Sequence, residues 1–472
     1  IDIAAKLLFI KYVEEKIMSS YGEDVYLNHL KVWNNLIEKE PIKIGVKDYL
    51  ESFMQIISDV KNDRFDFRKS PIFVNTKNEV INGSHRLAAA IYFNKPVYIK
   101  QADNLSGQAH CNYEIFQAHN NLYGKFKTQY LDSMVMEYIE RKENIFVITI
   151  FASAEGFDTE IVKKIKKFGD IVYRKDFFMN KENAIRFIDI LYQGEEWLKN
   201  GGRQNKTNFA FPNSGYVRTF FIEVNNPEDL IELKQDLRDF FDLGKHSLHI
   251  NDTREETIRI SKHLLNENTI EFINNVLPEE PFENSKKLFD KFYKEIEKKE
   301  IDKDAILLDG SFVLSLFLVR DIRDLDYICR GKITINKNYG NHNKYIEKFG
   351  FNADEWLFNP EKYFYYKGIK VLWIEEAKLF KKKRNELKDK EDLLVLHSKY
   401  APLPCSNEFE YLVGAVESIK QDIMTNNSEI LKLNDNQLQI NDQILLLKEV
   451  VDKLLLKRSP SQLIKRLLKY KK

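Results

Sequence analysis

Two aspartates separated by a single residue, Asp324 and Asp326, stand out in the last third of the chain. In a β-strand, residues i and i+2 point to the same face, so the pattern predicts two carboxylates side by side with the residue between them turned to the core. Two neighbouring carboxylates repel each other unless a cation lies between them, and Mg²⁺ or Mn²⁺ is a usual partner. Upstream, Gly310 and Ser311 follow an apolar strand predicted at 305–308 and can bring backbone N–H groups close to a phosphate. The spacing therefore predicts metal-assisted chemistry on a phosphate.

The order of Gly-Ser, an amphipathic helix and Asp-x-Asp on the next strand resembles the polymerase-β-type nucleotidyltransferases, over roughly residues 307–396. The resemblance implies that Asp324 and Asp326 are catalytic residues that hold Mg²⁺ (or Mn²⁺). It also implies that Gly310 and Ser311 bind the triphosphate of a nucleoside triphosphate substrate. An acceptor oxygen would then attack the α-phosphorus in line.

One feature that the resemblance implies, a third carboxylate on a later strand, is missing. The candidate strand is predicted at 363–373 and contains no Asp or Glu, and Glu375 and Glu376 follow it too late. One alternative is a nucleotidyltransferase fold that has lost its activity. The other is an ordinary β-α-β unit in which the two aspartates cap turns or pair with Arg320 and Arg323.

A second phosphate-binding pattern lies near the N-terminus, where Gly83, His85 and Arg86 open a predicted helix. Residues 70–100 predict a strand, a turn, a short strand, this Gly-Ser-His-Arg box, a helix and a final strand. A helix N-terminus attracts anions, and arginine adds a bidentate donor for phosphate. The segment is similar to the ParB/sulfiredoxin-like fold, which implies that the box binds nucleotide phosphates. The alternative is that His85 and Arg86 only cap and brace the helix.

The middle of the chain, residues 141–278, predicts strands and helices in the order βαββαβ, which implies a ferredoxin-like sandwich. Its last segment resembles nucleoside diphosphate kinases, which implies that Arg238 binds phosphate and that His249 is the catalytic, phosphorylated histidine. The Lys-Pro-Asp expected on the first strand is absent, so we expect a relative that keeps the fold without phosphotransfer. The alternative is that residues 251–253 only cap the helix predicted at 254–265.

The C-terminal part carries a heptad of apolar residues from 412 to 454. β-branched residues at a and leucine at d predict a coiled coil and favour a parallel homodimer, whose register Asn426 and Gln437 would fix. After Pro460, residues 461–472 predict a basic amphipathic helix that can lie on an anionic membrane surface. Two alternatives stay open: a long helix that packs on its own globular part, and a terminal helix that links to a further domain.

Length and composition set the remaining expectations. A chain of 472 residues is too long for one core, so we predict a multidomain protein of α/β and α+β type. The net charge of +1 predicts no specific nucleic-acid partner, and three well-separated cysteines predict a reducing cytoplasm. The predicted units are a ParB/sulfiredoxin-like domain at 1–140, a ferredoxin-like domain at 141–278, a nucleotidyltransferase-like domain at 279–406, a coiled coil at 407–458 and a basic amphipathic helix at 459–472.

Two functions fit these patterns. The first is a metal-dependent nucleotidyl- or phosphoryltransferase, cytoplasmic or peripheral on the inner face of the membrane. By analogy with fused transferases of this kind, we expect it to act in bacterial cell-surface polysaccharide (capsule) biosynthesis. The second is a non-catalytic nucleotide-binding scaffold or regulator, assembled by its coiled coil. The missing third carboxylate and the missing Lys-Pro-Asp favour the second function.

Overall fold

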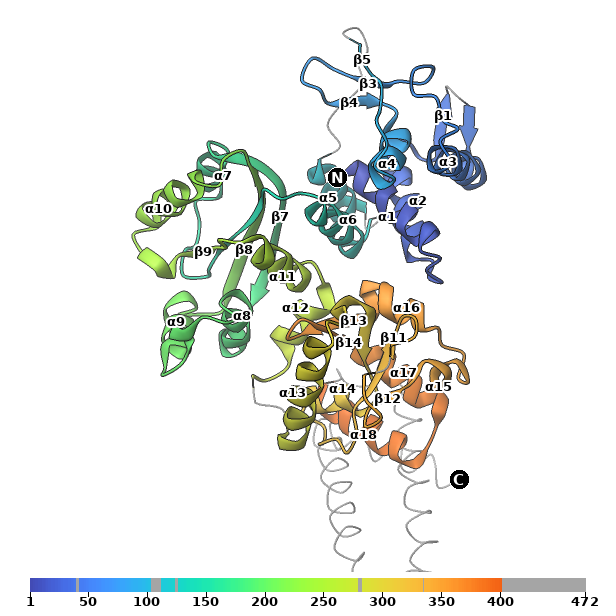
Figure 1. Ribbon diagram of the computed structural model, residues 1–472. Helices are drawn as coiled ribbons and strands as arrows, with labels where there is room; N and C mark the ends of the chain where they lie inside the picture. The colour runs from blue at the N-terminus through green and yellow to red at the C-terminus, as the bar shows by residue number, and fades with distance from the viewer. Residues whose placement is uncertain (40–41, 103–111, 124–125, 279–281, 334, 401–472) are drawn as a thin grey trace, which may run out of the picture.

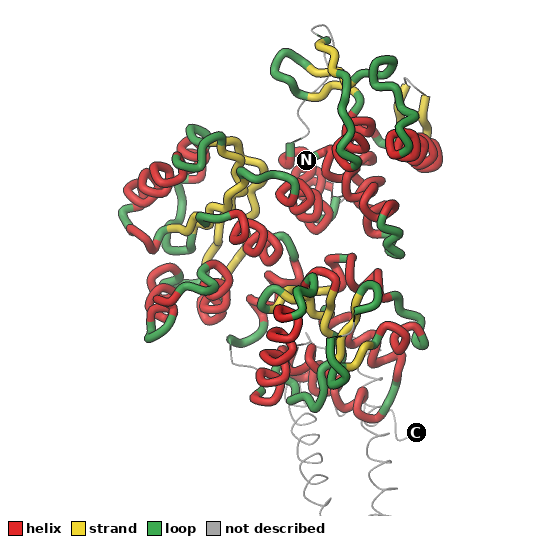
Figure 2. The backbone as a smooth tube through the Cα atoms, in the orientation of Figure 1, coloured by secondary structure: helices red, strands yellow, loops and turns green. Residues whose placement is uncertain are grey.

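The computed structural model describes residues 1–39, 42–102, 112–123, 126–278, 282–333 and 335–400 (Figure 1). Figure 2 shows that the strands gather in small sheets with helices around them, so the prediction of mixed α and β structure is confirmed. The predicted coiled coil and the basic terminal helix lie outside the described residues.

Among the residues that the structure describes, no helix combines the length and the apolar character needed to cross a membrane.

The first part of the chain packs helices around an aromatic centre formed by Phe9, Tyr26 and Phe53. A three-stranded sheet in the order β4-β3-β5 lies beside them, and Gly83 leads from β4 into α4 with a φ of +98°. The elements are α1 (Asp2–Glu14), α2 (Tyr21–Asn34), β1 (Ile37–Lys39), β2 (Ile42–Ile44), α3 (Gly45–Lys61), β3 (Ile72–Val74), β4 (Val80–Asn82), α4 (Ser84–Tyr92), β5 (Ile99–Gln101), α5 (Tyr113–Tyr123) and α6 (Thr128–Glu140).

The middle part is an antiparallel sheet in the order β7-β8-β6-β9. Strand β6 is buried on both faces, which explains its unbroken apolar sequence. Helices α7 and α10 pack on one face, and α8 and α11 on the other (Figure 1). The elements are β6 (Ile145–Ile150), α7 (Asp158–Ile165), β7 (Gly169–Met179), η1 (Lys181–Asn183), α8 (Ala184–Leu191), η2 (Glu196–Leu198), α9 (Gly202–Ala210), β8 (Gly215–Val224), α10 (Asp229–Phe241), η3 (Gly244–His246), β9 (Leu248–Ile250), α11 (Arg254–Leu264) and α12 (Glu267–Asn275).

The third part is built on a mixed sheet in the order β12-β11-β10-β14-β13. The central strand, β10, pairs antiparallel with β11 and parallel with β14. The elements are α13 (Glu283–Lys298), η4 (Lys303–Ala305), β10 (Ile306–Leu308), α14 (Ser311–Leu316), β11 (Asp326–Cys329), β12 (Gly340–Asn341), α15 (Asn343–Glu347), α16 (Ala353–Phe358), η5 (Pro360–Lys362), β13 (Tyr363–Tyr366), β14 (Ile369–Leu372), α17 (Ile374–Arg384) and α18 (Leu387–Tyr400).

The single strand predicted at 363–373 is wrong, because the segment folds into the hairpin of β13 and β14. Lys367 and Gly368 form its turn with positive φ angles of 48° and 79°. Two consecutive residues with positive φ match the right-handed twist of an antiparallel pair, so the chain reverses there.

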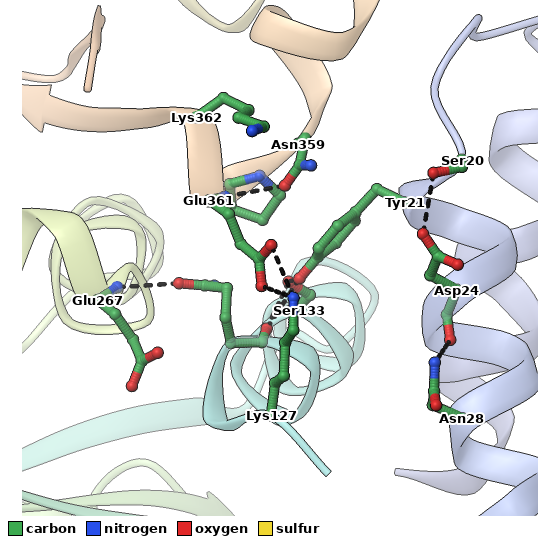
Figure 3. Close-up of polar contacts among 12 residues, drawn as sticks. Ser20, Tyr21, Asp24, Asn28, Lys127, Ser133, Glu267, Asn359, Glu361 and Lys362 are labelled. Atoms are coloured by element: carbon green, nitrogen blue, oxygen red, sulfur yellow. Dashed lines mark hydrogen bonds and ion pairs between the residues drawn. The ribbon is translucent and has the colours of Figure 1, made fainter. Parts of the chain in front are cut away.

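Helix α6 joins the three parts (Figure 3). The buried side-chain oxygen of Gln129 accepts from the backbone N–H of Glu267 at 2.9 Å, and the backbone carbonyl of Gln129 accepts from the hydroxyl of Tyr21 at 3.0 Å. At the start of α6, the ammonium of Lys127 lies 2.7 Å from the carboxylate of Glu361. One hydrophobic cluster continues from α1 and α6 through α12 into β13 and β14, and two further clusters lie wholly within the first and the middle parts.

Candidate functional site

The candidate site forms where β10 ends and β11 begins, because antiparallel pairing brings these two ends together. Leu308 is in register with Tyr327, which places Asp326 beside the residues that follow β10. Gly310 has a φ of +63°, and a Cβ atom there would lie 2.9 Å from Oδ2 of Asp326. A side chain at this position would therefore push the carboxylate away, and only glycine allows the close approach.

A cavity of about 600 Å³ opens at this point, and Gly310, Ser311, Asp324 and Asp326 all line it. The structure thus brings together four residues that the sequence analysis selected for one site. The other lining side chains are mainly basic or aromatic and come from the loop before β11, the N-cap of α15, and α15, β14, α17 and α18: Arg320, Arg323, His342, Tyr345, Leu372, Ala377, Phe380, Lys381, Arg384, Lys388 and Glu391.

The two aspartates do not share a strand, so this part of the prediction is wrong. Strand β11 begins at Asp326, and Asp324 lies in the bend before it, with the buried Leu325 between them. The register of the sheet is lost at Asp324 because β12, the neighbour of β11, pairs only as far as Asp326. Both carboxylates nevertheless face the same cavity, Asp324 exposed and Asp326 half-buried.

Pairing of the two aspartates with Arg320 and Arg323 does not occur among the described residues. Arg320 instead donates to Asp392 from Nε at 2.7 Å and from Nη2 at 3.1 Å. Asp392 also binds Lys381, whose ammonium lies 2.8 Å from Oδ2. Arg320 therefore braces the wall of the cavity and forms no ion pair with Asp324 or Asp326.

Two functional candidates escaped the sequence analysis: Asp309 and His342. The Nδ1 atom of His342 lies 3.0 Å from Oδ2 of Asp309, and its Nε2 atom lies 3.2 Å from Oδ1 of Asp326. Burial alone would lower the pKa of His342, but the hydrogen bonds and charges of the two carboxylates raise it from 6.5 to about 10. Asp309 could have been noticed because it directly precedes Gly310, whereas no spacing rule points to His342.

The strand that was the candidate for a third carboxylate contributes an apolar residue to the cavity, while the carboxylate of Glu391, on α18, also lines it. Leu372, at the end of β14, lines the cavity. Glu375 and Glu376, which follow it, lie in the first turn of α17 and pair with Lys378 and Lys362, each at 2.6 Å. In the described part of the chain, no three side chains of His, Cys, Asp or Glu already converge at the spacing of a metal site. A metal ion here would thus depend on few protein ligands.

The predicted box in the first part lines a separate cavity of about 750 Å³ together with Lys6 and Lys43. The ring of His85 is turned inwards, with Nε2 2.9 Å from the hydroxyl of Tyr26, and burial and the charge of Lys6 lower its pKa well below 6.5. Arg86 lies over the glycine, where a Cβ of Gly83 would be 2.9 Å from its Nη2 atom. His85 therefore braces the helix, as the alternative interpretation of this box predicts. Arg86 lines the cavity.

The predicted site of the middle part is closed. His249 is only 9% exposed, its Nε2 has no hydrogen-bond partner in the described structure, and its ring packs edge-on against Tyr192 at 4.5 Å. Burial, with the charges of nearby lysines and arginines, lowers the pKa of His249 to about 3. The buried Nε of Arg238 likewise has no described partner.

The N-capping alternative for residues 251–253 is confirmed, with Thr253 as the cap. Thr253 and Glu256 form a capping box at the start of α11. The amide of Asn251 donates to Thr253 O and Thr257 Oγ1, each at 2.8 Å, and its oxygen accepts from Val147 N at 2.6 Å. These bonds explain the motif without chemistry.

The three predicted sites stay apart, because the cavities of the first and third parts share no lining residue and His249 lines neither. Comparison of the chain with protein-family models, with curated proteins and with solved structures found no match.

Proposed function

We propose that the third part of the chain is a metal-dependent nucleotidyl- or phosphoryltransferase. The observation that carries the proposal is the meeting of Gly310, Ser311, Asp324 and Asp326 at one cavity. Both the loop after β10 and the carboxylate of Asp326 are held in place by sheet pairing rather than by flexible segments. Such preorganisation is what positioning and charge stabilisation in phosphoryl transfer require.

The residues present suit a divalent cation. Asp326 offers a half-buried carboxylate, and Oδ1 of the buried Asp309 lacks a hydrogen-bond partner among the described residues. When bound, Mg²⁺ or Mn²⁺ would neutralise negative charge on a triphosphate. Gly310 and Ser311 would bind the phosphates with backbone N–H groups and a hydroxyl, while Asp324 and Asp326 would hold the ion.

The other parts complete the proposal. The sheet order β7-β8-β6-β9 supports a ferredoxin-like middle domain, and the burial of His249 supports the loss of phosphotransfer there. The cavity around Arg86 supports phosphate or nucleotide binding by a ParB/sulfiredoxin-like first domain. A homodimer through 412–454, a membrane-surface role for 461–472 and a place in bacterial polysaccharide biosynthesis remain proposals from the sequence.

A non-catalytic nucleotide-binding scaffold is the second candidate, and Leu372 favours it. This residue lies at the strand end where a third carboxylate would complete an active nucleotidyltransferase site. A scaffold would bind nucleotide without turnover.

The two candidates differ in a direct test. The full chain is incubated with MgCl₂ or MnCl₂ and each nucleoside triphosphate, products are followed by phosphorus NMR, and binding is followed by the thermal shift. Asp324→Asn and Asp326→Asn should abolish turnover without loss of the fold, while Asp290→Asn, on the exposed side of α13, should behave like wild type. Binding without turnover would support the scaffold, and wild-type turnover in both variants would remove the metal site.

A further inference from the structure

In the arrangement Asp309–His342–Asp326, an imidazole lies between two carboxylates. A metal site made of carboxylates alone would not need this imidazole. Asp309 is 1% exposed and His342 is 19% exposed, so the first is sealed behind the second. Oδ2 of Asp309 is 3.0 Å from Nδ1 of the imidazole, and an ionised carboxylate can only accept. Nδ1 therefore donates to Asp309, and Nε2 is the nitrogen that faces the cavity side of the site.

Nε2 of His342 and Oδ1 of Asp326 lie 3.2 Å apart. With Nδ1–H engaged, neutral imidazole presents a lone pair at Nε2 to an oxygen that also presents lone pairs. Two lone pairs this close repel each other unless a positively charged atom lies between Nε2 and Oδ1. A proton can fill that place, and so can a metal ion, because two cis ligands with bonds of about 2.1 Å are about 3 Å apart.

The two candidate ligands are fixed from several sides. A Cβ at Gly340 would lie 2.4 Å from Oδ1 of Asp326, so this carboxylate fits between two glycines, Gly310 on the other side. The backbone N–H of His342 donates to Tyr327 O at 2.9 Å, and its ring packs on Tyr345 at 5.1 Å. A buried carboxylate behind a histidine is also how proteins orient imidazole ligands of metals.

We propose that Nε2 of His342, held by Asp309, is a direct ligand of the divalent cation together with Asp326, and that this nitrogen makes the site prefer Mn²⁺ to Mg²⁺. The inference rests on the proposed function for the identity of the site. Mg²⁺ takes oxygen ligands, whereas first-row transition metals also accept imidazole. Together with Asp324, these ligands still leave positions for water and phosphate oxygens around a six-coordinate ion. Asp309 is then a positioning residue.

The test measures the metal directly on the full chain. Mn²⁺ binding is followed by the EPR signal of the free ion, and pulsed EPR records coupling to a bound imidazole nitrogen. We expect nitrogen coupling in wild type, its loss in His342→Gln, and Mn²⁺ binding weakened about 10–100-fold in that variant. Asp309→Asn should also weaken Mn²⁺ binding, His246→Gln in the middle part should not, and Mg²⁺ should displace Mn²⁺ only in large excess.

Each outcome decides a separate question. Mn²⁺ binding that depends on Asp326 but shows no nitrogen coupling would overturn the ligand role of His342 and leave the proposed function intact. Equal affinities for Mg²⁺ and Mn²⁺ would overturn the preference. Nitrogen coupling without any nucleotide turnover would keep the site and reject the transferase. If His342→Gln fails to fold, the wild-type protein still provides a test. Labelling with ¹⁵N-histidine should change the nitrogen coupling of bound Mn²⁺, and a spectrum without nitrogen coupling would overturn the ligand role of His342.

Discussion

Removal of the imidazole from the Asp309–His342 pair should destabilise the third part of the chain strongly at neutral pH. In His342→Ala, the carboxylate of Asp309, which is 1% exposed in the wild type, loses its only described side-chain hydrogen-bond partner. Removal of one member of a buried ion pair costs on the order of 3–5 kcal/mol, because the other charge is left uncompensated. The double variant Asp309→Asn/His342→Gln should cost less than the two single changes together, with a coupling of about 0.5–3 kcal/mol.

The pH dependence of this stabilisation follows from the raised pKa of His342. A group whose pKa rises from 6.5 unfolded to about 10 folded contributes fully below pH 6.5, and its contribution is lost as the pH rises through 10. At about 1.36 kcal/mol per pH unit, the upper bound is about 5 kcal/mol, and the partial exposure of the ring reduces it. Burial raises the pKa of Asp309, and this shift also makes the folded state more stable at lower pH.

Two measurements check this reasoning. Urea unfolding of the full chain between pH 6 and 10, followed by tryptophan fluorescence, should show a fall in stability that His342→Gln abolishes. NMR of metal-free, ¹⁵N-histidine-labelled protein should show His342 as imidazolium at pH 8, assigned by the missing signal of the variant. A His342 ring that is neutral at pH 8 and titrates near 6.5 would refute the bridge between the two carboxylates.

Four further predictions concern other positions. Gly340→Ala places a Cβ 2.4 Å from Oδ1 of Asp326, so the carboxylate must turn away; we expect weaker metal binding by calorimetry with a stability loss of only about 1 kcal/mol. Arg86→Ala should weaken phosphate binding measured by calorimetry, while the exposed Arg68→Ala should not; equal binding in both would exclude the phosphate role. His249 should acquire no acid-labile phosphate from labelled ATP because its Nε2 is buried and its pKa is about 3. Light scattering should find a dimer for the full chain and a monomer for 1–406, and a dimeric truncated chain would place the interface outside the predicted coil.

Local pattern was enough to predict which segments meet at the candidate site. Gly310 and Asp326 are joined by the short helix α14 and a loop, and consecutive strands usually lie side by side, which favoured the meeting of their ends that the structure has. The position of Asp324 was not predictable from the alternation of residues, because the first residue of a strand depends on where its neighbour stops pairing. Strand β11 begins at Asp326, which pairs with Gly340, the first residue of β12.

The rest of the site depends on contacts that sequence spacing does not encode. His342 reaches Asp309 from 33 residues away, through a short strand, β12, of only two residues. Lys367, a residue that rarely takes a positive φ, forms the turn that splits the predicted long strand into a hairpin. Such choices are made by the packing of the whole sheet and not by local propensity.

The charge balance of the cavity supports the proposal that a cation binds there. Several basic side chains line it, but Lys381 and Arg384 bind Asp389, at 3.1 Å and 2.5 Å, and Arg320 binds Asp392. Three cations meet two carboxylates in this network, so it keeps one net positive charge beside the cavity. Arg323 has no ion pair among the described residues and is left as one guanidinium for a triphosphate. Arg323 and the one excess charge of the network cannot balance a triphosphate beside the carboxylates of Asp324, Asp326 and Glu391. A divalent ion at Asp326 would therefore supply positive charge that the described side chains lack.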